Sequence, residues 1–453
     1  MKIVIIGAGE VGFHIAKKLS EEKHEVVIID KDPRKIRRIN ENLDVQSILG
    51  SGTSPKILRE LRLEEADMLV AATDSDEVNL ISCLLARNLN RYMIKVARVK
   101  NQEYLKEKEL FKKELLGVDM IINTRSMMVE TVLNLMNVPG ASEVIEFAGG
   151  QVKLIGFSIT GGSPLAGRQL ISMKAIEGDF LIAAILRGHR IIIPRGRDII
   201  QANDLVYIVA RSSDLERVLE QFHINTKETK NILIVGGGEM GAAIASTLDG
   251  RKLNVKIMDM DGERCKELAV MLKKVVVIRG DGTDRDLLRE ERAEDADMMI
   301  AVTGDEESNV LISLLAKDLG TKRTITRVSK LSYMPVVCSI GLDTVINPRM
   351  FAVRAILQYI RRGKIISVVP LREEHAEAIE AEALETSDIV NVPLSQVKFP
   401  EGAIVGAVIR GEEIIIPKGE TIIKANDRLI IFAMQQVVPQ LEDLLTVKLE
   451  YFA

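Results

Sequence analysis

The chain has 453 residues, and at about 150 residues per domain this length predicts roughly three domains, with two or four equally open. Apolar residues make up 47% and charged residues 28% of the sequence, so we expect a folded chain and not a disordered one. The 61 Lys and Arg residues are balanced by 65 Asp and Glu residues, a net charge of −4. No global positive field exists to hold nucleic acid or an anionic membrane, so neither is expected as a direct partner.

The sequence indicates no segment that crosses a membrane. Its longest uncharged apolar stretches, such as 180–186 and 298–302, are far shorter than the ~20 residues that span a bilayer. The apolar run before Gly7 is too short for the core of a signal peptide. The three cysteines are odd in number and widely separated, which argues against a disulfide framework. We therefore expect a cytoplasmic protein in a reducing compartment.

In chain order, the first unit alternates short apolar runs with stretches of helical spacing. Strands are expected at 3–6, 26–29, 68–72 and 94–99, and helices at 12–22, 33–42 and 77–90. Almost wholly apolar strands between helices predict an α/β, doubly wound parallel sheet. Further along, RGHRIIIP and RGEEIIIP each predict a hairpin turn followed by a strand, within a small α+β module.

These units occur twice. The opening IVIIGAGEVG returns 229 residues later as ILIVGGGEMG, and a shorter block at 178–210 returns at 401–433. The order is therefore A-B-A′-B′, which indicates duplication. The four expected domains are residues 1–133 and 230–360 for the longer unit, and 134–224 and 364–453 for the shorter one.

A G-x-G-x-x-G pattern follows the first strand of each longer unit and opens a helix, the setting in which it binds a pyrophosphate. Gly7 permits the tight turn, Gly9 lets the backbone approach the phosphates, and Gly12 lets helix and strand pack closely. The N–H groups of Glu10 and Val11 lack helical partners and form an anion site. The second copy repeats the pattern with Gly236, Gly238, Glu239, Met240 and Gly241. The alternative is that the glycines serve packing alone.

An acidic residue ends the second strand of each copy, Asp30 in the first and Asp259 in the second. Its carboxylate can accept hydrogen bonds from both ribose hydroxyls and would repel a 2′-phosphate. This favours NAD, or another adenosine nucleotide with a free ribose, over NADP. Lys31 follows Asp30 directly and would soften that discrimination.

Further candidates lie at the carboxyl edge of the sheet, where open α/β sheets bind ligands. Thr73 and Asp74 follow the fourth strand, Thr303 follows its copy, and Arg98 and Arg327 end the fifth strand of each unit. The threonines and Asp74 are expected either to contact a nucleotide or to cap a turn. The arginines are expected either to neutralise phosphate or to form a surface ion pair.

The sequence indicates no catalytic or metal site. The five histidines occupy no duplicated position, so none is expected to act as a base. Tyr104 and Lys108 have the Y-x-x-x-K spacing of short-chain reductases, but we expect them on one charged surface helix, EYLKEKELFKKELL. No Cys/His cluster has zinc spacing and no Walker-type loop occurs. We therefore expect no enzyme.

Together, the A-B-A′-B′ order, GAGEVG with Asp30, SGTSPKILRE, ADMLVAATDSDEVN and VARVKNQEYL resemble the TrkA family, the cytosolic regulatory subunits of Trk-type potassium uptake. The resemblance covers essentially the whole chain. It implies tandem RCK domains, each with a Rossmann-like, NAD-binding N-terminal subdomain and a small α+β C-terminal subdomain. It also implies a homotetrameric gating ring beneath a TrkH-type potassium-translocating subunit, at the inner face of the cell membrane, with NAD/NADH and ATP/ADP as effectors.

The resemblance also implies which residues line two nucleotide sites. The first would be lined by Gly7, Gly9, Glu10, Val11, Asp30, Thr73, Asp74 and Arg98. The second would be lined by Gly236, Gly238, Glu239, Met240, Asp259 and Thr303. Ser51 stands where the second copy has Asp281. If that acidic position contacts the ligand, the two sites should prefer different nucleotides.

Gating would follow from differential affinity, because a nucleotide that binds one ring shape better shifts the population toward it. Two helices rich in Met and Leu, around 126–136 and 350–360, are expected to make domain–domain contacts. Two other interpretations stay open. One is an NAD-dependent oxidoreductase with duplicated nucleotide-binding units, and the other is a regulatory domain of a potassium/proton antiport system with the same ligand.

Overall fold

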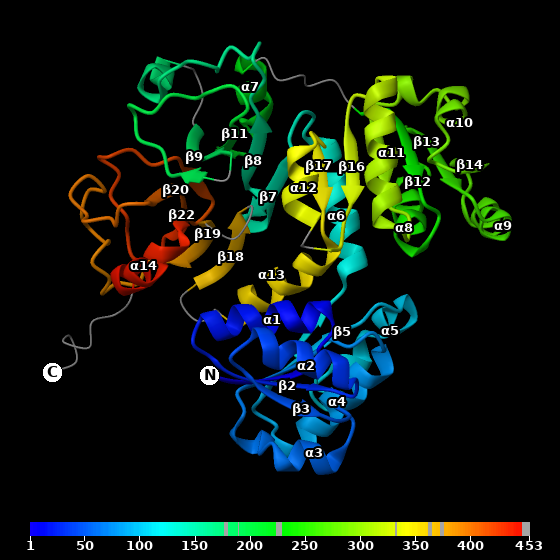
Figure 1. Cartoon of the computed structure of the whole chain (residues 1–453). Coiled ribbons are helices and arrows are strands. Elements are labelled where there is room, and N and C mark those ends of the chain that lie inside the picture. The colour runs from blue at the N-terminus through cyan, green and yellow to red at the C-terminus, as the bar shows by residue number, and fades with distance from the viewer. Residues whose placement is uncertain are drawn as a thin grey trace. The chain divides into compact units, whose positions relative to one another are not determined.

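The computed structural model forms four sheets in the duplicated order expected from the sequence (Figure 1). By backbone proximity the chain divides into two compact units. The first contains Met1–Met128 together with Val328–Ser332 and Ile346–Ile356, and the second contains the rest. The structure describes residues 1–175, 180–188, 190–222, 229–330, 333–360, 365–371 and 376–445.

The first sheet has the strand order β3-β2-β1-β4-β5-β6, with parallel pairing between all neighbours. This is the order of a Rossmann fold. Its strands are β1 (Lys2–Ile6), β2 (Glu25–Asp30), β3 (Gln46–Leu49), β4 (Met68–Ala71), β5 (Ile94–Arg98) and β6 (Met120–Ile122). The expected doubly wound sheet is confirmed, and the four strands expected from the sequence lie within one residue of their predicted bounds.

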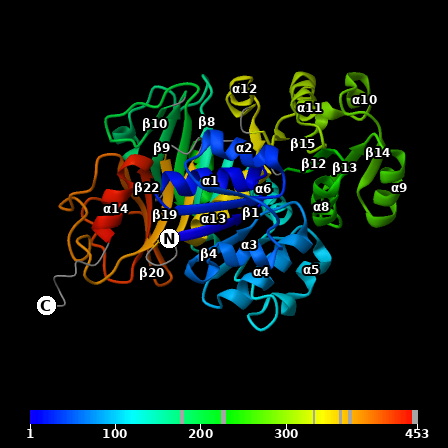
Figure 2. The same ribbon diagram turned by 60° about the horizontal axis from the view of Figure 1, so that its bottom comes forward.

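Helices cover both faces of this sheet. Figures 1 and 2 both show α1 (Glu10–Glu21) and α2 (Pro33–Asn42) on one face, with α3 (Pro55–Glu60) and α4 (Asp76–Leu89) on the other. Ile3, Val4 and Ile5 of β1 are fully buried because helices pack on both sides of the strand. The central strands thereby hold the carboxyl ends of β1, β2, β4 and β5 at one edge.

The expectation of one long charged helix around Tyr104 was wrong. Helix α5 (Gln102–Lys106) ends two residues before Lys108, which begins a separate 3-10 helix, Lys108–Phe111. Glu107 lies between them with φ −87° and ψ 65°, outside the helical region. The tyrosine hydroxyl donates a hydrogen bond to Glu77 Oε1 at 3.4 Å. The Y-x-x-x-K pair is therefore not carried on one continuous helix.

The second sheet repeats the first, with the order β14-β13-β12-β15-β16-β17. Its strands are β12 (Asn231–Val235), β13 (Asn254–Asp259), β14 (Val276–Arg279), β15 (Met298–Ala301), β16 (Thr324–Arg327) and β17 (Thr344–Ile346). Its helices are α8 (Glu239–Leu248), α9 (Gly262–Met271), α10 (Arg285–Glu290), α11 (Glu306–Leu319) and α12 (Met334–Ser339). Strand order and helix sequence thus repeat those of the first sheet.

The two shorter units are antiparallel five-stranded sheets, ordered β10-β9-β11-β8-β7 and β18-β19-β22-β20-β21. The first is built from β7 (Glu143–Phe147), β8 (Val152–Ser158), β9 (Phe180–Arg187), β10 (Arg190–Ile192) and β11 (Leu205–Arg211), and is followed by α7 (Leu215–Gln221). The second is built from β18 (Ile365–Leu371), β19 (Ala376–Glu382), β20 (Ala403–Arg410), β21 (Glu413–Ile415) and β22 (Arg428–Met434), and is followed by α14 (Val438–Leu445). The small α+β modules are confirmed.

The two predicted hairpins are also confirmed. Strand β9 pairs with β10, and β20 with β21, in antiparallel register. Gly188 and Gly411 in their turns both have φ +60°, a left-handed conformation that glycine adopts without a steric penalty. The repeated Arg-Gly string therefore has a turn function.

The two helices rich in Met and Leu do contact a second domain. The first half of α13 (Pro348–Ile360), which follows the second Rossmann-like sheet in the chain, belongs to the compact unit of the first one. In the other compact unit, Leu135 of α6 (Thr124–Asn137) accepts a hydrogen bond at 2.9 Å from Arg323, at the edge of the second Rossmann-like sheet. The predicted role of these helices in domain–domain contacts is confirmed.

Candidate functional site

Two of the three motif glycines in each copy are required by the fold itself. Gly7 has φ +104°, and a Cβ there would lie 3.0 Å from the backbone nitrogen of Thr73. A Cβ on Gly12 would lie 1.8 Å from the carbonyl oxygen of Gly7, an impossible contact. The second copy has the same geometry, with φ +109° at Gly236 and 1.8 Å between a Cβ on Gly241 and the Gly236 oxygen. These glycines permit the turn and the close packing of helix on strand.

The middle glycine of each motif is not required by the fold. A Cβ on Gly9 would meet nothing closer than the flexible end of Lys35 at 3.9 Å, and a Cβ on Gly238 would meet nothing within 4 Å. Both residues have negative φ, so the backbone does not demand glycine there either. An open approach to the backbone at this position is what a pyrophosphate needs. The turn therefore fits a dinucleotide phosphate.

Helices α1 and α8 begin directly after these glycines. Gly9 and Gly238 are the N-cap residues, and neither helix has a side-chain cap at its N-terminus. The first-turn N–H groups of Glu10 and Glu239 are thus presented to a ligand with the positive end of the helix dipole. Val11 is buried, and Met240, its counterpart, is partly buried.

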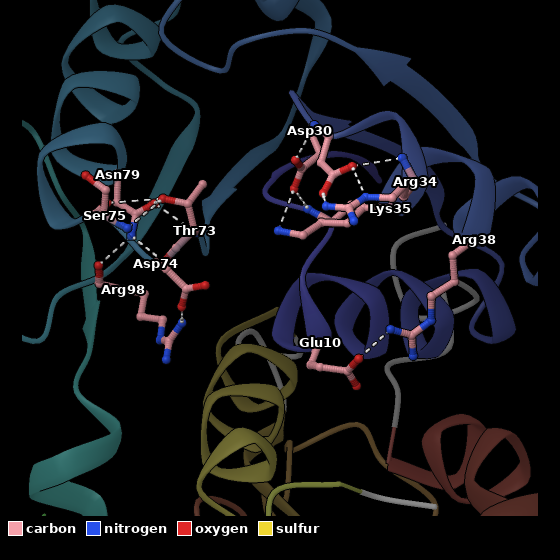
Figure 3. Close-up of polar contacts among 12 residues, drawn as sticks. Glu10, Asp30, Arg34, Lys35, Arg38, Thr73, Asp74, Ser75, Asn79 and Arg98 are labelled. Carbon is pink, nitrogen blue, oxygen red and sulfur yellow. Dashed lines mark hydrogen bonds and ion pairs between the residues drawn. The ribbon is translucent and has the colours of Figure 1, made fainter. Parts of the chain in front are cut away.

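Asp30 is held against the glycine turn at the tip of β2 (Figure 3). Its Oδ2 accepts the N–H of Ala8 at 2.7 Å and its Oδ1 accepts the N–H of Asp32 at 2.9 Å. A carboxylate has about four acceptor positions, so two remain for ribose hydroxyls. Lys35 lies 3.6 Å from Oδ2, while Lys31, which the sequence singled out, is exposed.

Asp259 has the same arrangement in the second copy. It accepts the N–H of Gly237 at 2.5 Å and the N–H of Asp261 at 2.9 Å. The residue that matches Lys35 is Arg264, whose Nε donates to the carbonyl oxygen of Gly237 at 2.7 Å. Sequence reasoning missed this pair of cations beside the glycine turns. The signal was present, because a basic residue recurs at the same offset of 229 residues.

Thr73 serves the turn between β4 and α4. Its N–H and its hydroxyl both donate to the side-chain oxygen of Asn79, at 2.9 and 2.7 Å, and Asn79 Nδ2 donates to the carbonyl oxygen of Arg98 at 2.8 Å. Thr303 and Asn309 repeat this network, with 2.8 Å for both bonds from Thr303 and 3.1 Å for the bond from Asn309 Nδ2 to the carbonyl oxygen of Arg327. The asparagine ties the ends of two strands together. Sequence reasoning missed it, although it recurs in both copies.

Arg98 points toward the same edge, next to Asp74 (Figure 3). Its Nη1 donates to Asp74 Oδ1 at 3.1 Å, and Lys100 lies 3.3 Å from the same oxygen. The side chain is 15% exposed, and its buried Nε has no hydrogen-bond partner among the described residues. In the second copy, glycine replaces Asp74, and Arg327 donates to the carbonyl oxygen of Thr303 at 3.1 Å. Arg98 thus pairs with a carboxylate at the edge of the sheet, whereas Arg327 donates to a backbone carbonyl.

Glu10 is the centre of a charged cluster at the start of α1. Its carboxylate accepts a hydrogen bond from Arg38, and Arg349 lies 3.6 Å from Oε2. The hydrogen bond from Arg38, aided by the charge of Arg349, holds the pKa of Glu10 below its usual range. In the second copy the residue at the place of Arg38 is Glu267, which pairs with Arg264 at 2.6 Å. The N-terminal ends of α1 and α8 therefore differ in their surrounding charge.

Ser51 and Asp281 stand at equivalent positions of the two copies, each in a loop where its side chain contacts the threonine two residues later. Ser51 Oγ lies 2.8 Å from the Thr53 hydroxyl, and Asp281 Oδ1 accepts the N–H and the hydroxyl of Thr283 at 2.9 and 2.8 Å. The hydrogen bonds from Thr283 lower the pKa of Asp281. Both residues thus serve the turn, whatever else they contact.

The described part of the chain shows neither a metal-binding cluster nor a membrane-spanning helix. Among the residues placed by the structure, no group of three or more His, Cys, Asp or Glu side chains is arranged to hold a metal ion. Within the same part of the chain, no helix combines the length and the apolar character that a membrane crossing requires.

Comparison with known proteins places this chain in a family. The TrkA-N domain model matches residues 3–124 and 232–348, and the TrkA-C domain model matches 154–223 and 378–446. The chain is 35% identical to the Trk system potassium uptake protein TrkA of Halomonas elongata, over 100% of both chains. It is 38% identical to Trk system potassium uptake protein TrkA homolog 1 of Methanosarcina mazei, over 98% of this chain and 99% of that one.

The alignment with a solved structure of the GsuK channel bound to NAD covers 98% of this chain and 78% of that chain, with a TM-score of 0.61 and 18% identity. The two chains share a fold. The full-length identities and the two domain models, each matched twice in alternation, decide the family. The chain belongs to the family of Trk system potassium uptake proteins TrkA.

Proposed function

We propose that this chain is the nucleotide-sensing regulatory subunit of a membrane potassium transporter. The proposal rests on the family, whose curated members are named Trk system potassium uptake proteins, and on one structural observation. That observation is the pair of glycine turns in which Gly9 and Gly238 leave the backbone open although the fold does not need a glycine there. The role of these turns is to bind nucleotide phosphates.

The proposed ligands are NAD or NADH, with ATP and ADP as further effectors. In each site the glycine turn and the first helical turn hold the phosphates, and Asp30 or Asp259 accepts the ribose hydroxyls. Arg98 supplies a positive charge to the first site, and Lys35 and Arg264 join the sites as cations beside the turns. Thr73, Asp74 and Thr303 shape the edge of the sheet, and the turn contacts observed for the threonines support this role over direct binding.

The proposed mechanism is gating of an oligomeric ring without chemistry on the nucleotide. A ligand shifts a two-state equilibrium only by its difference in affinity for the two states. Each chain would contain four domains, at residues 1–133, 134–224, 230–360 and 364–453. Four such chains would form a homotetramer beneath a TrkH-type subunit at the cytoplasmic face of the membrane. The alternative is an NAD-dependent oxidoreductase.

Flux measurements test the proposal. The chain and a TrkH-type subunit are reconstituted in liposomes, and potassium flux is measured with and without NADH or ATP. We expect nucleotide-dependent flux that the Asp30→Ala/Asp259→Ala variant abolishes, since that variant lacks both ribose acceptors. A flux that is the same with and without nucleotide would contradict the proposal, and consumption of NADH in the presence of oxo- or hydroxy-acids would favour the oxidoreductase.

A further inference from the structure

The first nucleotide site is not built from the first copy alone. Residues 328–330, which follow β16, and residues 346–356, which begin with the last residue of β17, belong to the compact unit of the first sheet. Within that unit Arg349, the second residue of α13, lies 3.6 Å from the carboxylate of Glu10. Figure 3 shows the start of α13, in faint yellow, beside Glu10.

Arg349 is held in place by hydrogen bonds to Ser329 and Asn347. Its Nη1 donates to the carbonyl oxygen of Ser329 at 3.1 Å, and its backbone N–H donates to Asn347 Oδ1 at 2.9 Å. The amide of Asn347 donates in turn to the same Ser329 oxygen at 3.3 Å. Since Ser329 and Asn347 are buried, the guanidinium is positioned by packed groups and is only partly exposed itself. It is therefore a preorganised cation.

Glu10 gives this cation a function. It is the first residue of α1, next to Gly9, at the end of the helix that would receive the phosphates. Its side chain is an anion at that end, and like charges repel. Arg38 and Arg349 together offset the carboxylate, so the cluster carries a net positive charge. Without one of the arginines, the cluster would be neutral and would no longer attract the phosphates.

We propose that Arg349 completes the first nucleotide site by giving the cluster around Glu10 its net positive charge, and that phosphate binding is thereby coupled to α13 and to the C-terminal subdomain that follows it. The inference rests on the proposed nucleotide binding. By reciprocity, a contact of α13 that strengthens nucleotide binding is itself strengthened by the nucleotide. Arg349 is a positioning residue in this scheme, since it acts through Glu10.

The test uses the full chain with the second site disabled by Asp259→Ala, and isothermal titration with ADP. Arg349→Gln is expected to weaken ADP binding about tenfold, within the usual range for coupled sites. Arg349→Lys keeps the charge and should retain most of the affinity. Glu10→Gln combined with Arg349→Gln should restore it, because Arg38 then stands without the carboxylate and the cluster regains its net positive charge. Arg59→Gln, at an exposed arginine on α3, controls for loss of one positive charge.

The outcomes separate the inference from the proposed function. Unchanged ADP affinity in Arg349→Gln, or a loss that Glu10→Gln does not rescue, would overturn the role of Arg349 while leaving the nucleotide site intact. A loss of equal size in Arg59→Gln would overturn it as well, because the effect would then be one of net charge. If the Asp259→Ala chain bound no ADP at all, the first site itself would be wrong, and the inference would fall with it.

Discussion

The glycine turns allow ligand binding to be separated from folding with single methyl groups. In the Gly9→Ala/Gly238→Ala variant the added carbons meet nothing closer than 3.9 Å. We expect the free energy of unfolding to stay within about 1 kcal/mol of wild type, because the lower entropy of the unfolded chain and the slightly poorer helix cap nearly cancel. In Gly12→Ala the methyl lies 1.8 Å from the Gly7 oxygen, and overpacking of that kind costs about 3 kcal/mol or more.

NADH binding, unlike stability, should be sensitive to the Gly9→Ala/Gly238→Ala variant. The methyl groups of the Gly9→Ala/Gly238→Ala variant occupy the approach to the backbone that a pyrophosphate needs, so NADH affinity should fall at least about tenfold, or about 1.4 kcal/mol. Titration calorimetry measures the affinity and urea unfolding measures the stability. Gly161→Ala, where a Cβ also meets nothing within 4 Å, is the matched control. Wild-type NADH affinity in the Gly9→Ala/Gly238→Ala variant would refute the assignment of the phosphate site.

Three further predictions concern stability and reactivity. Asn79→Ala should lower the free energy of unfolding by about 2–4 kcal/mol in urea, because it strips partners from Thr73 and from the carbonyl of Arg98; a neutral result would contradict this. Burial raises the pKa of the Cys83 thiol to about 12, so peptide mapping after alkylation at pH 8 should find Cys83 modified only as fast as the chain unfolds. Burial also lowers the pKa of Arg323 to about 10, which corresponds to a cost of about 3 kcal/mol for burying the charge and offsets the hydrogen bond from Arg323 to α6. Arg323→Met should therefore change the free energy of unfolding in urea by under about 1 kcal/mol. A loss above about 3 kcal/mol would show that the hydrogen bond outweighs the cost of burial.

The sequence predicted those elements whose side chains are uniformly buried. Strands β1, β2, β4 and β5 are central and nearly all apolar, so their runs stand out between turns. The edge strands β3 and β6 were not identified, because they are three or four residues long and half exposed. The other elements were predicted from the duplication, because an element expected in one copy is also expected at the matching position of the other copy.

The candidate site was predictable only where its parts are close in sequence. The glycines and Asp30 follow a known spacing, and the structure places them together. Asn79 was identifiable in principle from its recurrence as Asn309. Arg349 was not, because nothing in the local sequence indicates that the start of α13 returns to the first sheet. A contact between segments far apart in the chain depends on packing and leaves no local pattern.

Duplication within one chain suits a sensor that must shift a large assembly. Moving a ring from 1:99 to 99:1 requires about 5.5 kcal/mol of differential binding. Two sites in each of four proposed subunits divide that demand, so each needs only about 0.7 kcal/mol, or roughly a threefold preference for one ring shape. A single charge beside the phosphates is enough to produce a preference of that size. The exchange of Arg38 in the first copy for Glu267 in the second is such a change. Two glycine turns with the same backbone geometry therefore need not prefer the same nucleotide.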